Sequence, residues 1–411
     1  MATVTSGSPG LDRLRSSDLP WTDIRKFGAD RTGVSNCKAA FAAAFAVGGR
    51  IYVPPGDYKM LDVAYFSAPI HLELAPTARI LSSGSAFTDT FVFGAYAAIA
   101  GISIRGGQFI NTATAPGAFR IGSGSSNVEI EGVYCTGFSS GGACIYATSV
   151  NGLRVKRNRF LSSYGAMLAF GDCVDVSFRD NFVSGMANNG VRISGSSGDF
   201  SIGVDISDNE FGPSTGNQSP ISVTCIDAVK HKRVRISGNG VQGLGIPFAD
   251  GGNADLISTF GVDGLVVANN KLSGAGDLFI AVEQVTKASI TGNVGVGADM
   301  SGITVKESSH VSVTGNTLVD VGKDINAITN RATSPLCGVL VFNATDTVII
   351  EGNVVSDVDG GAADYAVGVN KSSGTMTNIL VGMNAHSGMT SGEIFVKAGE
   401  SVTKATAAAY P

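Results

Sequence analysis

A short alternating run of apolar and polar residues, closed by Gly-Asn, recurs along the chain. Its clearest copy is Val311-Ser-Val-Thr-Gly-Asn316, in which Val311 and Val313 would face one side of a strand and the polar residues the other. Glycine and asparagine both tolerate a positive φ, so the closing pair predicts a turn. Further copies end at Asn239, Asn270, Asn293 and Asn353, weaker copies end at Asn158, Asn181, Asn209 and Asn384, and residues 128–132 form a copy without the asparagine.

The spacing between the closing asparagines indicates a repeating unit. From Asn158 to Asn384 the differences are 23, 28, 30, 31, 23, 23, 37 and 31 residues. A minimum near 23 with variable additions is typical of a solenoid with insertions in some loops. Because the units are rich in strands and lack a helical period, we expect an all-β protein, a right-handed parallel β-helix whose like positions stack at about 4.8 Å. The asparagines should then form a ladder in one turn, each side-chain amide bonded to its neighbours.

The residues before the repeats follow a different pattern. The alanine-rich run 37–47, with Phe41 and Phe45 four residues apart, predicts a helix with Asn36 as its N-cap and Gly48-Gly49 as its end. The stretch 21–58, with DIRKFGADRTGVSNCKAAFAAAF followed by GGRIYVPPGDY, resembles the opening of pectate-lyase-superfamily β-helix proteins. That group includes phage tailspikes, polysaccharide lyases and glycoside hydrolases. The resemblance implies that the helix caps the N-terminal end of the β-helix, where an open stack would expose core and unpaired strand edge.

The chain is expected to divide into four parts. Residues 1–20 are predicted to be a flexible leader or linker, 21–60 an N-terminal cap, 61–396 the parallel β-helix and 397–411 a tail of small residues. The N-terminus lacks the basic and apolar regions of a secretory signal, and no run of 18 apolar residues exists to span a membrane. Resemblance to tailspikes implies a homotrimer and an extracellular or virion-associated location.

Composition narrows the function classes. The net charge is −5 and no basic cluster stands out, which disfavours nucleic-acid binding. The six cysteines are scattered without a CxxC pair, and we expect small apolar core residues rather than disulfides or a zinc site. No cofactor or metal is predicted, because the chain has no Walker loop and no metal-spaced histidine cluster.

A carboxylate pair is the first candidate site. A glycine-rich loop carries Asp250 and Asp255, and Asp277 follows one repeat later. Asp255 lies 15 residues before Asn270 and Asp277 lies 16 before Asn293, so the two carboxylates are expected on adjacent coils. Glycoside hydrolysis uses such a pair, and proximity raises the pKa of one member, as a general acid requires. The alternative is ordinary turn chemistry, in which aspartate precedes a strand.

Asp227, Lys230 and His231 form a second candidate. A lyase or epimerase abstracts a proton beside a uronate carboxylate, and His231 or Lys230 would be the base. The alternative is a solvated turn between two strands. His310, which falls in what we take to be the equivalent turn of a later coil, weakens the case for His231 as a special residue.

Exposed strand positions provide a third candidate, a column of polar and aromatic side chains on one sheet. It is predicted to contain Arg192, Ser194, Glu283, Lys306, Phe342 and Asn370. We expect Arg192, Glu283 and Lys306, together with His231 and Asp227, to bind substrate. The preferred function is binding and hydrolysis of a polysaccharide by Asp255 and Asp277, with Asp250 assisting. The alternatives are a polysaccharide lyase or epimerase acting on uronic-acid polymers, and a non-catalytic trimeric adhesin or structural spike.

Overall fold

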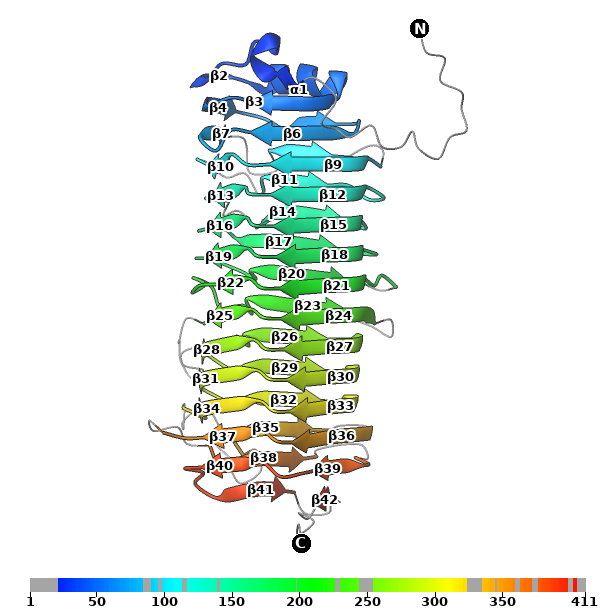
Figure 1. Ribbon diagram of the computed structural model, residues 1–411, viewed down its shortest axis with the longest axis vertical. Helices are drawn as coiled ribbons and strands as arrows, with labels where there is room; N and C mark the ends of the chain where they lie inside the picture. Colours follow the sequence, from blue (N-terminus) through cyan, green and yellow to red (C-terminus); the bar gives the residue numbers. More distant parts are fainter. Residues whose placement is uncertain are drawn as a thin grey trace.

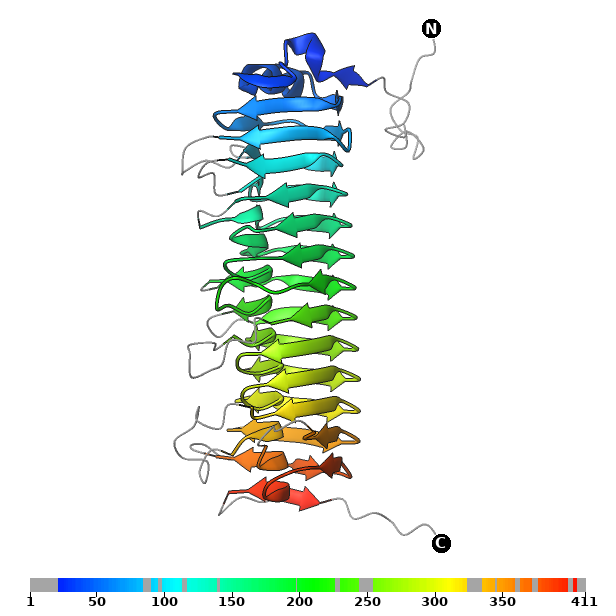
Figure 2. The ribbon, with the colours of Figure 1, turned by 90° about the vertical axis from the view of Figure 1, so that its left-hand side faces the viewer.

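The protein is a column of stacked coils whose strands lie across its long axis (Figures 1 and 2). The computed structural model describes residues 21–83, 90–94, 98–112, 117–138, 141–196, 198–225, 230–243, 254–323, 335–343, 346–358, 363–371, 376–397 and 402–404. Within these residues the strands form three sheets, in which neighbouring strands pair in parallel. The predicted all-β, right-handed parallel β-helix is confirmed.

We name the sheets A, B and C. Within the described residues, sheet A has 15 strands, which are β1 (Thr22–Asp23), β3 (Gly49–Val53), β6 (Ile70–Leu74), β9 (Ala100–Arg105), β12 (Ser126–Glu131), β15 (Asn151–Lys156), β18 (Val174–Arg179), β21 (Ile202–Ser207), β24 (His231–Ser237), β27 (Val262–Ala268), β30 (Thr286–Thr291), β33 (Ser309–Thr314), β36 (Asp346–Glu351), β39 (Ile379–Val381) and β42 (Val402–Lys404). Sheet B likewise has 14, which are β2 (Thr32–Asn36), β4 (Gly56–Met60), β7 (Ala78–Ser82), β10 (Gln108–Asn111), β13 (Tyr134–Thr136), β16 (Arg159–Leu161), β19 (Phe182–Ser184), β22 (Glu210–Phe211), β25 (Gly240–Gln242), β28 (Lys271–Ala275), β31 (Val294–Ala298), β34 (Thr317–Val321), β37 (Val354–Ser356) and β40 (Ala385–Ser387). Sheet C, in the same described part, has 13, which are β5 (Ala64–Phe66), β8 (Phe91–Phe93), β11 (Phe119–Ile121), β14 (Ala143–Thr148), β17 (Gly165–Phe170), β20 (Val191–Gly195), β23 (Ile221–Cys225), β26 (Ile257–Phe260), β29 (Ile280–Glu283), β32 (Ile303–Lys306), β35 (Cys337–Phe342), β38 (Tyr365–Asn370) and β41 (Gly392–Val396).

Each coil visits sheets C, A and B in turn, and the insertions fall in particular connections. From β12 to β37, two residues join each strand of sheet A to the following strand of sheet B. The connection from sheet B to sheet C varies, and it contains the long excursions between β25 and β26 and between β34 and β35. The variable repeat length that the sequence shows therefore arises largely before sheet C.

The asparagine ladder occupies the invariant turn between sheets A and B. The backbone N–H of Asn293 donates to Asn316 Oδ1 at 3.0 Å, and its Nδ2 donates to the same oxygen at 2.9 Å and to Val267 O at 3.0 Å. The same pattern links Asn158, Asn181, Asn209, Asn239, Asn270, Asn293, Asn316, Asn353 and Asn384, all of them buried. The predicted ladder is confirmed.

The two residues of the Gly-Asn pair have different roles in the turn. Gly292, Gly315 and Gly352, each directly before a ladder asparagine, have φ values of 65°, 64° and 64°. In other coils Arg157 and Asn269 hold this left-handed position, with φ of 55° and 56°. The glycine thus makes the turn, and the asparagine supplies the amide.

The core fills the inside of the column. In β33 the side chains of Val311 and Val313 are buried while Ser312 and Thr314 are half-buried, as the alternation predicts. Burying a valine or isoleucine side chain contributes about 1.5–3 kcal/mol, and one such pair recurs in coil after coil. All six cysteines are buried and free, so the prediction that they are core residues is confirmed.

A helix lies at the N-terminal end of the column (Figure 1). Helix α1 spans Lys38–Val47 and follows the 3-10 helix η3 (Ile24–Phe27). Its Phe45 stacks on Phe66 at 3.6 Å between ring centroids, and Phe41 lies 5.3 Å from Phe91. The N-cap residue is Cys37 and makes no side-chain cap, but Asn36 Oδ1 accepts from the Lys38 N–H at 3.1 Å. Among the described residues, no helix is both long and apolar enough to cross a membrane.

Candidate functional site

Asp255 and Asp277 lie on neighbouring coils in the connection from sheet B to sheet C. Asp255 precedes β26 by two residues, and Asp277 precedes β29 by three. The two segments are hydrogen-bonded, since the Leu256 N–H donates to Leu278 O at 3.0 Å. The arrangement agrees with the spacing from the ladder asparagines, and like positions on adjacent coils are about 4.8 Å apart.

A third carboxylate, Asp299, extends this series into the next coil. Asp299 precedes β32 by four residues, and the adjacent Met300 N–H donates to Asp277 O at 3.1 Å. Our sequence analysis missed it, although Asp299 lies 17 residues before Asn316 and continues the intervals of 15 and 16. We call Asp255, Asp277 and Asp299 the carboxylate series.

Burial and mutual repulsion separate the pKa values within the series. Burial raises the pKa of Asp255 to about 8, and the charge of Asp277 adds to the effect. Ser258 and the Leu278 N–H oppose it by hydrogen bonding to the charged form. Burial raises the pKa of Asp277 to about 6, with a further contribution from Asp299. At pH 7 Asp255 is therefore protonated and Asp277 is mostly ionised.

One oxygen of the series has an unusual environment. Asp255 retains some solvent exposure as a residue, yet its Oδ1 atom is buried and has no hydrogen-bond partner among the described residues. A buried carboxylate oxygen without a hydrogen-bond partner destabilises the ionised form, and so favours the neutral acid. The described part of the chain holds no group of three or more His, Cys, Asp or Glu side chains arranged to bind a metal. The remaining predicted catalytic residue, Asp250, lies outside the described residues.

The outer face of sheet C carries the predicted column of polar and aromatic side chains, but one of the predicted residues lies outside it. Strand register stacks Phe170, Ser194, Thr224, Phe260, Glu283, Lys306, Phe342 and Asn370 in one line. Lys306 Nζ lies 2.5 Å from Glu283 Oε1. Arg192 stands in the neighbouring line with Ser222 and Ser258, while Ser194 and Asn370 are buried. Within this line the ion pair lies between the rings of Phe260 and Phe342, and all four of these side chains are half-buried.

His231 takes no part in an open site. It is fully buried, its Nδ1 accepts from the Ser201 N–H at 2.8 Å, and its Nε2 lies 3.0 Å from Thr224 O. Burial lowers its pKa, so it is held neutral as a link between coils. This geometry favours a structural role over the predicted contact with substrate. Its proposed neighbour Asp227 lies outside the described residues.

His310 is not equivalent to His231, contrary to our expectation from the sequence. His231 is in register with Val262, whereas His310 follows Ser309, which is in register with Thr286. The two histidines therefore stand two positions apart in the repeat, one buried and the other 56% exposed in its side chain. The exposed histidine belongs to a different surface, described below.

Comparison with solved structures reveals similar folds at low sequence identity. The surface adhesin PfbA of Streptococcus pneumoniae aligns over 82% of this chain and 90% of its own, with 14% identity and a TM-score of 0.60. The catalytic unit of a GH87 α-1,3-glucanase from Streptomyces thermodiastaticus aligns over 95% and 71%, with 16% identity and a TM-score of 0.57. Tailspike protein 3 of bacteriophage CBA120 aligns over 88% and 63%, with 15% identity and a TM-score of 0.53. No family model and no curated protein sequence matches the chain.

Proposed function

We propose that this protein binds a polysaccharide and hydrolyses its glycosidic bonds, with Asp255 as the general acid and Asp277 as the base or nucleophile. The observation that carries the proposal is the pair of raised and separated pKa values on adjacent coils, about 8 and about 6. Two carboxyl groups in opposite protonation states at one pH are what glycoside hydrolysis requires.

The proposed reaction assigns one step to each group. Asp255 donates its proton to the glycosidic oxygen as the bond from that oxygen to the anomeric carbon breaks, and the leaving sugar departs as an alcohol. Asp277 either attacks the anomeric carbon or removes a proton from the attacking water, and the carboxylates stabilise the positive charge that develops on the sugar ring. Water supplies the hydroxyl of the new reducing end, and the second proton returns the acid to its starting state.

The outer face of sheet C is the proposed platform for the sugar chain. Ser258, which bonds Asp255, belongs to β26, and Phe260 on the same strand lies beside Glu283 in the next. Half-buried aromatic rings provide apolar faces for sugar rings, and the polar ends of Glu283 and Lys306 suit hydroxyl groups. The solved structures that resemble this chain include a glucanase and a tailspike, which is in keeping with a polymeric sugar as ligand.

A screen of purified protein against capsular, O-antigen and plant polysaccharides tests the proposal. We expect new reducing ends without the ultraviolet absorbance of an unsaturated uronate, and both Asp255→Asn and Asp277→Asn should abolish them. Asp175→Asn, at an exposed position of β18, is the matched control and should keep full rate. Full activity in either site variant would contradict the assignment, and absorbance rising with the reducing ends would make the enzyme a lyase.

Binding without cleavage is the second candidate, and one observation favours it. The adhesin PfbA covers the chain with the highest TM-score of the three comparisons given above, and the column on sheet C needs no catalytic group to hold a glycan. A protein that retains labelled glycan and releases no sugar ends would have this function. In either case we propose an extracellular or virion-associated location.

We also propose a homotrimer that meets along sheet B. Val294 and Val296 of β31 and Val354 of β37 are between 42% and 44% exposed on its outer face. An apolar stripe on a parallel stack is a surface that a second and third copy can cover. Light scattering after size exclusion should give three times the mass of one chain, and Val294→Lys with Val296→Lys should lower it to one.

A further inference from the structure

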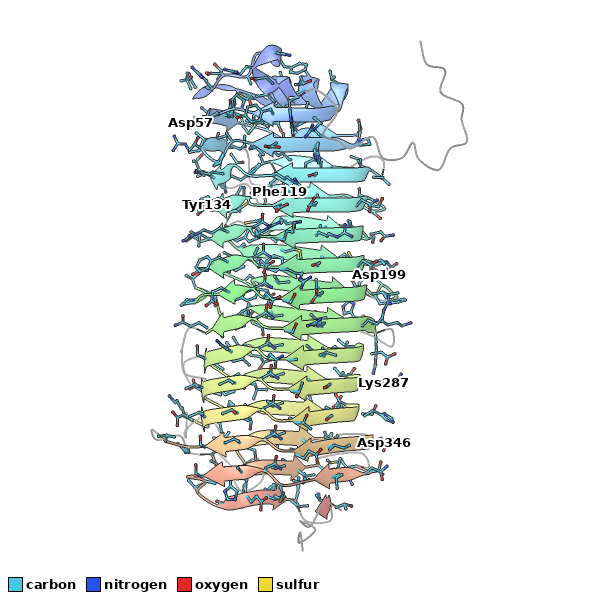
Figure 3. The ribbon with its side chains drawn as sticks, viewed as in Figure 1. Asp57, Phe119, Tyr134, Asp199, Lys287 and Asp346 are labelled. Carbon is cyan, nitrogen blue, oxygen red and sulfur yellow. The ribbon has the colours of Figure 1, made fainter. Side chains whose placement is uncertain are left out.

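An open groove of about 550 Å³ crosses four strands on the outer face of sheet A. Its lining comes from β24, β27, β30 and β33, and its exposed apolar side chain is that of Val266, whereas Leu265 and Ala288 are buried in the core. Its rim carries Arg233, Arg235, Lys287 and His310. The groove is distinct from the carboxylate series, which precedes strands of sheet C. Figure 3 shows Lys287, with Asp346, on one edge of the column and Tyr134 on the opposite edge.

Within the groove, one of the four coils has no side chain at a position that a long or cyclic polar side chain fills in the other three. Register places Arg233, Gly264, Lys287 and His310 side by side on successive coils. At Gly264 an added Cβ would meet only backbone atoms of Arg233, at 3.7 and 3.9 Å, so the space above it is open. The glycine thus leaves a gap between two long cationic side chains.

Two cations of the rim and the rim imidazole stand where the backbone is left-handed. Arg233, Lys287 and His310 have φ values of 56°, 61° and 56°. In the coils nearer the N-terminus the same position is held by Gly101, Asn127, Gly152, Asp175 and Gly203, the residue types that adopt this conformation most readily. Arginine and lysine are poorly suited to it, and residues held against local preference cluster at functional sites. Two independent observations, the gap and the placement of the cations, therefore point to the same surface.

The charge of the groove is only partly neutralised. Lys287 Nζ lies 3.5 Å from Asp263, and His310 Nε2 lies 3.7 Å from Asp346. Arg235 Nε donates to Ser237 Oγ at 2.9 Å. Because serine is neutral, this hydrogen bond does not compensate the charge of the arginine. Among the described residues no ion pair to Arg233 or Arg235 is present. Cations are thus displayed around an exposed apolar side chain on a chain whose net charge is −5.

We propose that this groove binds an acidic polysaccharide, a linear sugar polymer that carries carboxylate or sulfate groups. Arg233 and Lys287 stand two coils apart, and coils repeat at about 4.8 Å, so each can contact a different anionic group of one polymer. The lining residues include no Phe, Tyr or Trp on which nucleic-acid bases would stack. The inference concerns a second site and does not require that Asp255 and Asp277 be catalytic, so the two proposals fail separately.

Binding is tested with dextran sulfate and polygalacturonate as anionic probes, with neutral dextran and a single-stranded oligothymidylate as comparisons. We expect affinity for at least one anionic sugar, weakened by salt, and little for dextran or the oligonucleotide. Equal binding of dextran, tighter binding of the oligonucleotide, or no binding of either anionic sugar would overturn the proposal.

Replacing rim cations by glycine separates binding from folding. Because glycine adopts positive φ without strain, Arg233→Gly with Lys287→Gly should leave the melting temperature unchanged or higher. The same variant should weaken binding by about tenfold or more, since two charge-assisted contacts are lost. Arg157→Gly is the matched control, because it removes a left-handed cation that pairs with Glu131 away from the groove. Unchanged affinity in the double variant, or an equal loss in the control, would contradict the proposed site.

Discussion

Two stacks of polar side chains run along this column, and they respond to stacking in opposite ways. Ladder asparagines at the turn between sheets A and B each donate to the asparagine of the next coil and accept from that of the coil before, so Asn270, Asn293 and Asn316 form a satisfied neutral chain. Carboxylates before sheet C are acceptors only. Burial raises the pKa values of Asp255 and Asp277 to about 8 and about 6, and a carboxylate on the next coil, Asp277 and Asp299 respectively, adds to each rise.

The difference teaches how one geometry yields either a scaffold or a reactive site. A coil spacing of about 4.8 Å suits the amide because each step pairs a donor with an acceptor. Ionised carboxylates on neighbouring coils offer acceptors but no donor, so their charges add to the effect of burial in raising the pKa values. The side-chain type, rather than the position in the coil, decides which outcome results.

Asn293→Asp should have the largest effect on the free energy of unfolding, because it places a carboxylate in the asparagine ladder. The aspartate loses both Nδ2 donations, to Asn316 Oδ1 and to Val267 O, and buries a charge beside acceptors. We expect the free energy of unfolding to fall by about 5 kcal/mol at pH 7, measured by urea denaturation. Ser312→Asp, on the half-buried outer face of β33, is the control and should change it by less than about 1 kcal/mol. Equal losses in the two variants would mean that the ladder amides contribute little.

Asp255→Asn should have the second-largest effect. Unlike Asn293→Asp, it should raise the free energy of unfolding at alkaline pH. The pKa of Asp255 is raised from 3.8 to about 8, so the folded state binds the extra proton and its stability falls as pH rises through that window. The variant removes this dependence and should be more stable at pH 8.5 by about 3 kcal/mol. That is less than the ~5 kcal/mol of the full window, because asparagine keeps a buried oxygen without a partner.

The measurement is denaturant unfolding of both proteins between pH 5 and pH 9. Asp175→Asn, at an exposed position of β18, serves as control and should follow the parent curve. Parallel curves for the parent and Asp255→Asn across this range would show that Asp255 titrates at an ordinary pKa.

Asp299→Asn should give the smallest effect, a shift confined to one neighbour. Removing the charge of Asp299 removes the second cause of the raised pKa of Asp277, while burial remains. We expect the pKa of Asp277 to fall by less than about one unit, which corresponds to ~1 kcal/mol. Carbon-detected NMR of the carboxyl groups reports it directly, with Asp180→Asn as the control. A pKa that stays near 6 would assign the whole shift to burial.

The fold was predictable from the sequence because its determinants are local and repeated. Val311 and Val313 define a strand face, and the spacing of Asn293 and Asn316 defines the coil. Asp255 and Asp277 were found by counting back from these asparagines. Asp299 was missed because the carboxylate series moves one residue further from its asparagine in each coil.

Other features of the sites depend on contacts that no local pattern reveals. His231 was predicted as a base or a contact to substrate, with a solvated turn as the alternative, yet its ring is buried and its Nδ1 accepts from the Ser201 N–H. Arg233 and Lys287 lie two coils apart in the column, and their sequence neighbours give no sign that Gly264 lies between them. Such groupings depend on strand register, which decides the neighbours of every outward side chain.

The two-residue turn between sheets A and B has a consequence for how such a protein changes. Asn316 and Asn353 are 37 residues apart, yet their N–H···Oδ1 and Nδ2···Oδ1 distances of 3.0 and 2.9 Å match those of the 23-residue step from Asn293. The extra residues are absorbed before sheet C and leave the ladder unaltered. Loops of different length and sequence can therefore be inserted before sheet C while the ladder contacts stay the same. Binding specificity can change there, in evolution or by loop grafting, without altering the residues that determine the fold.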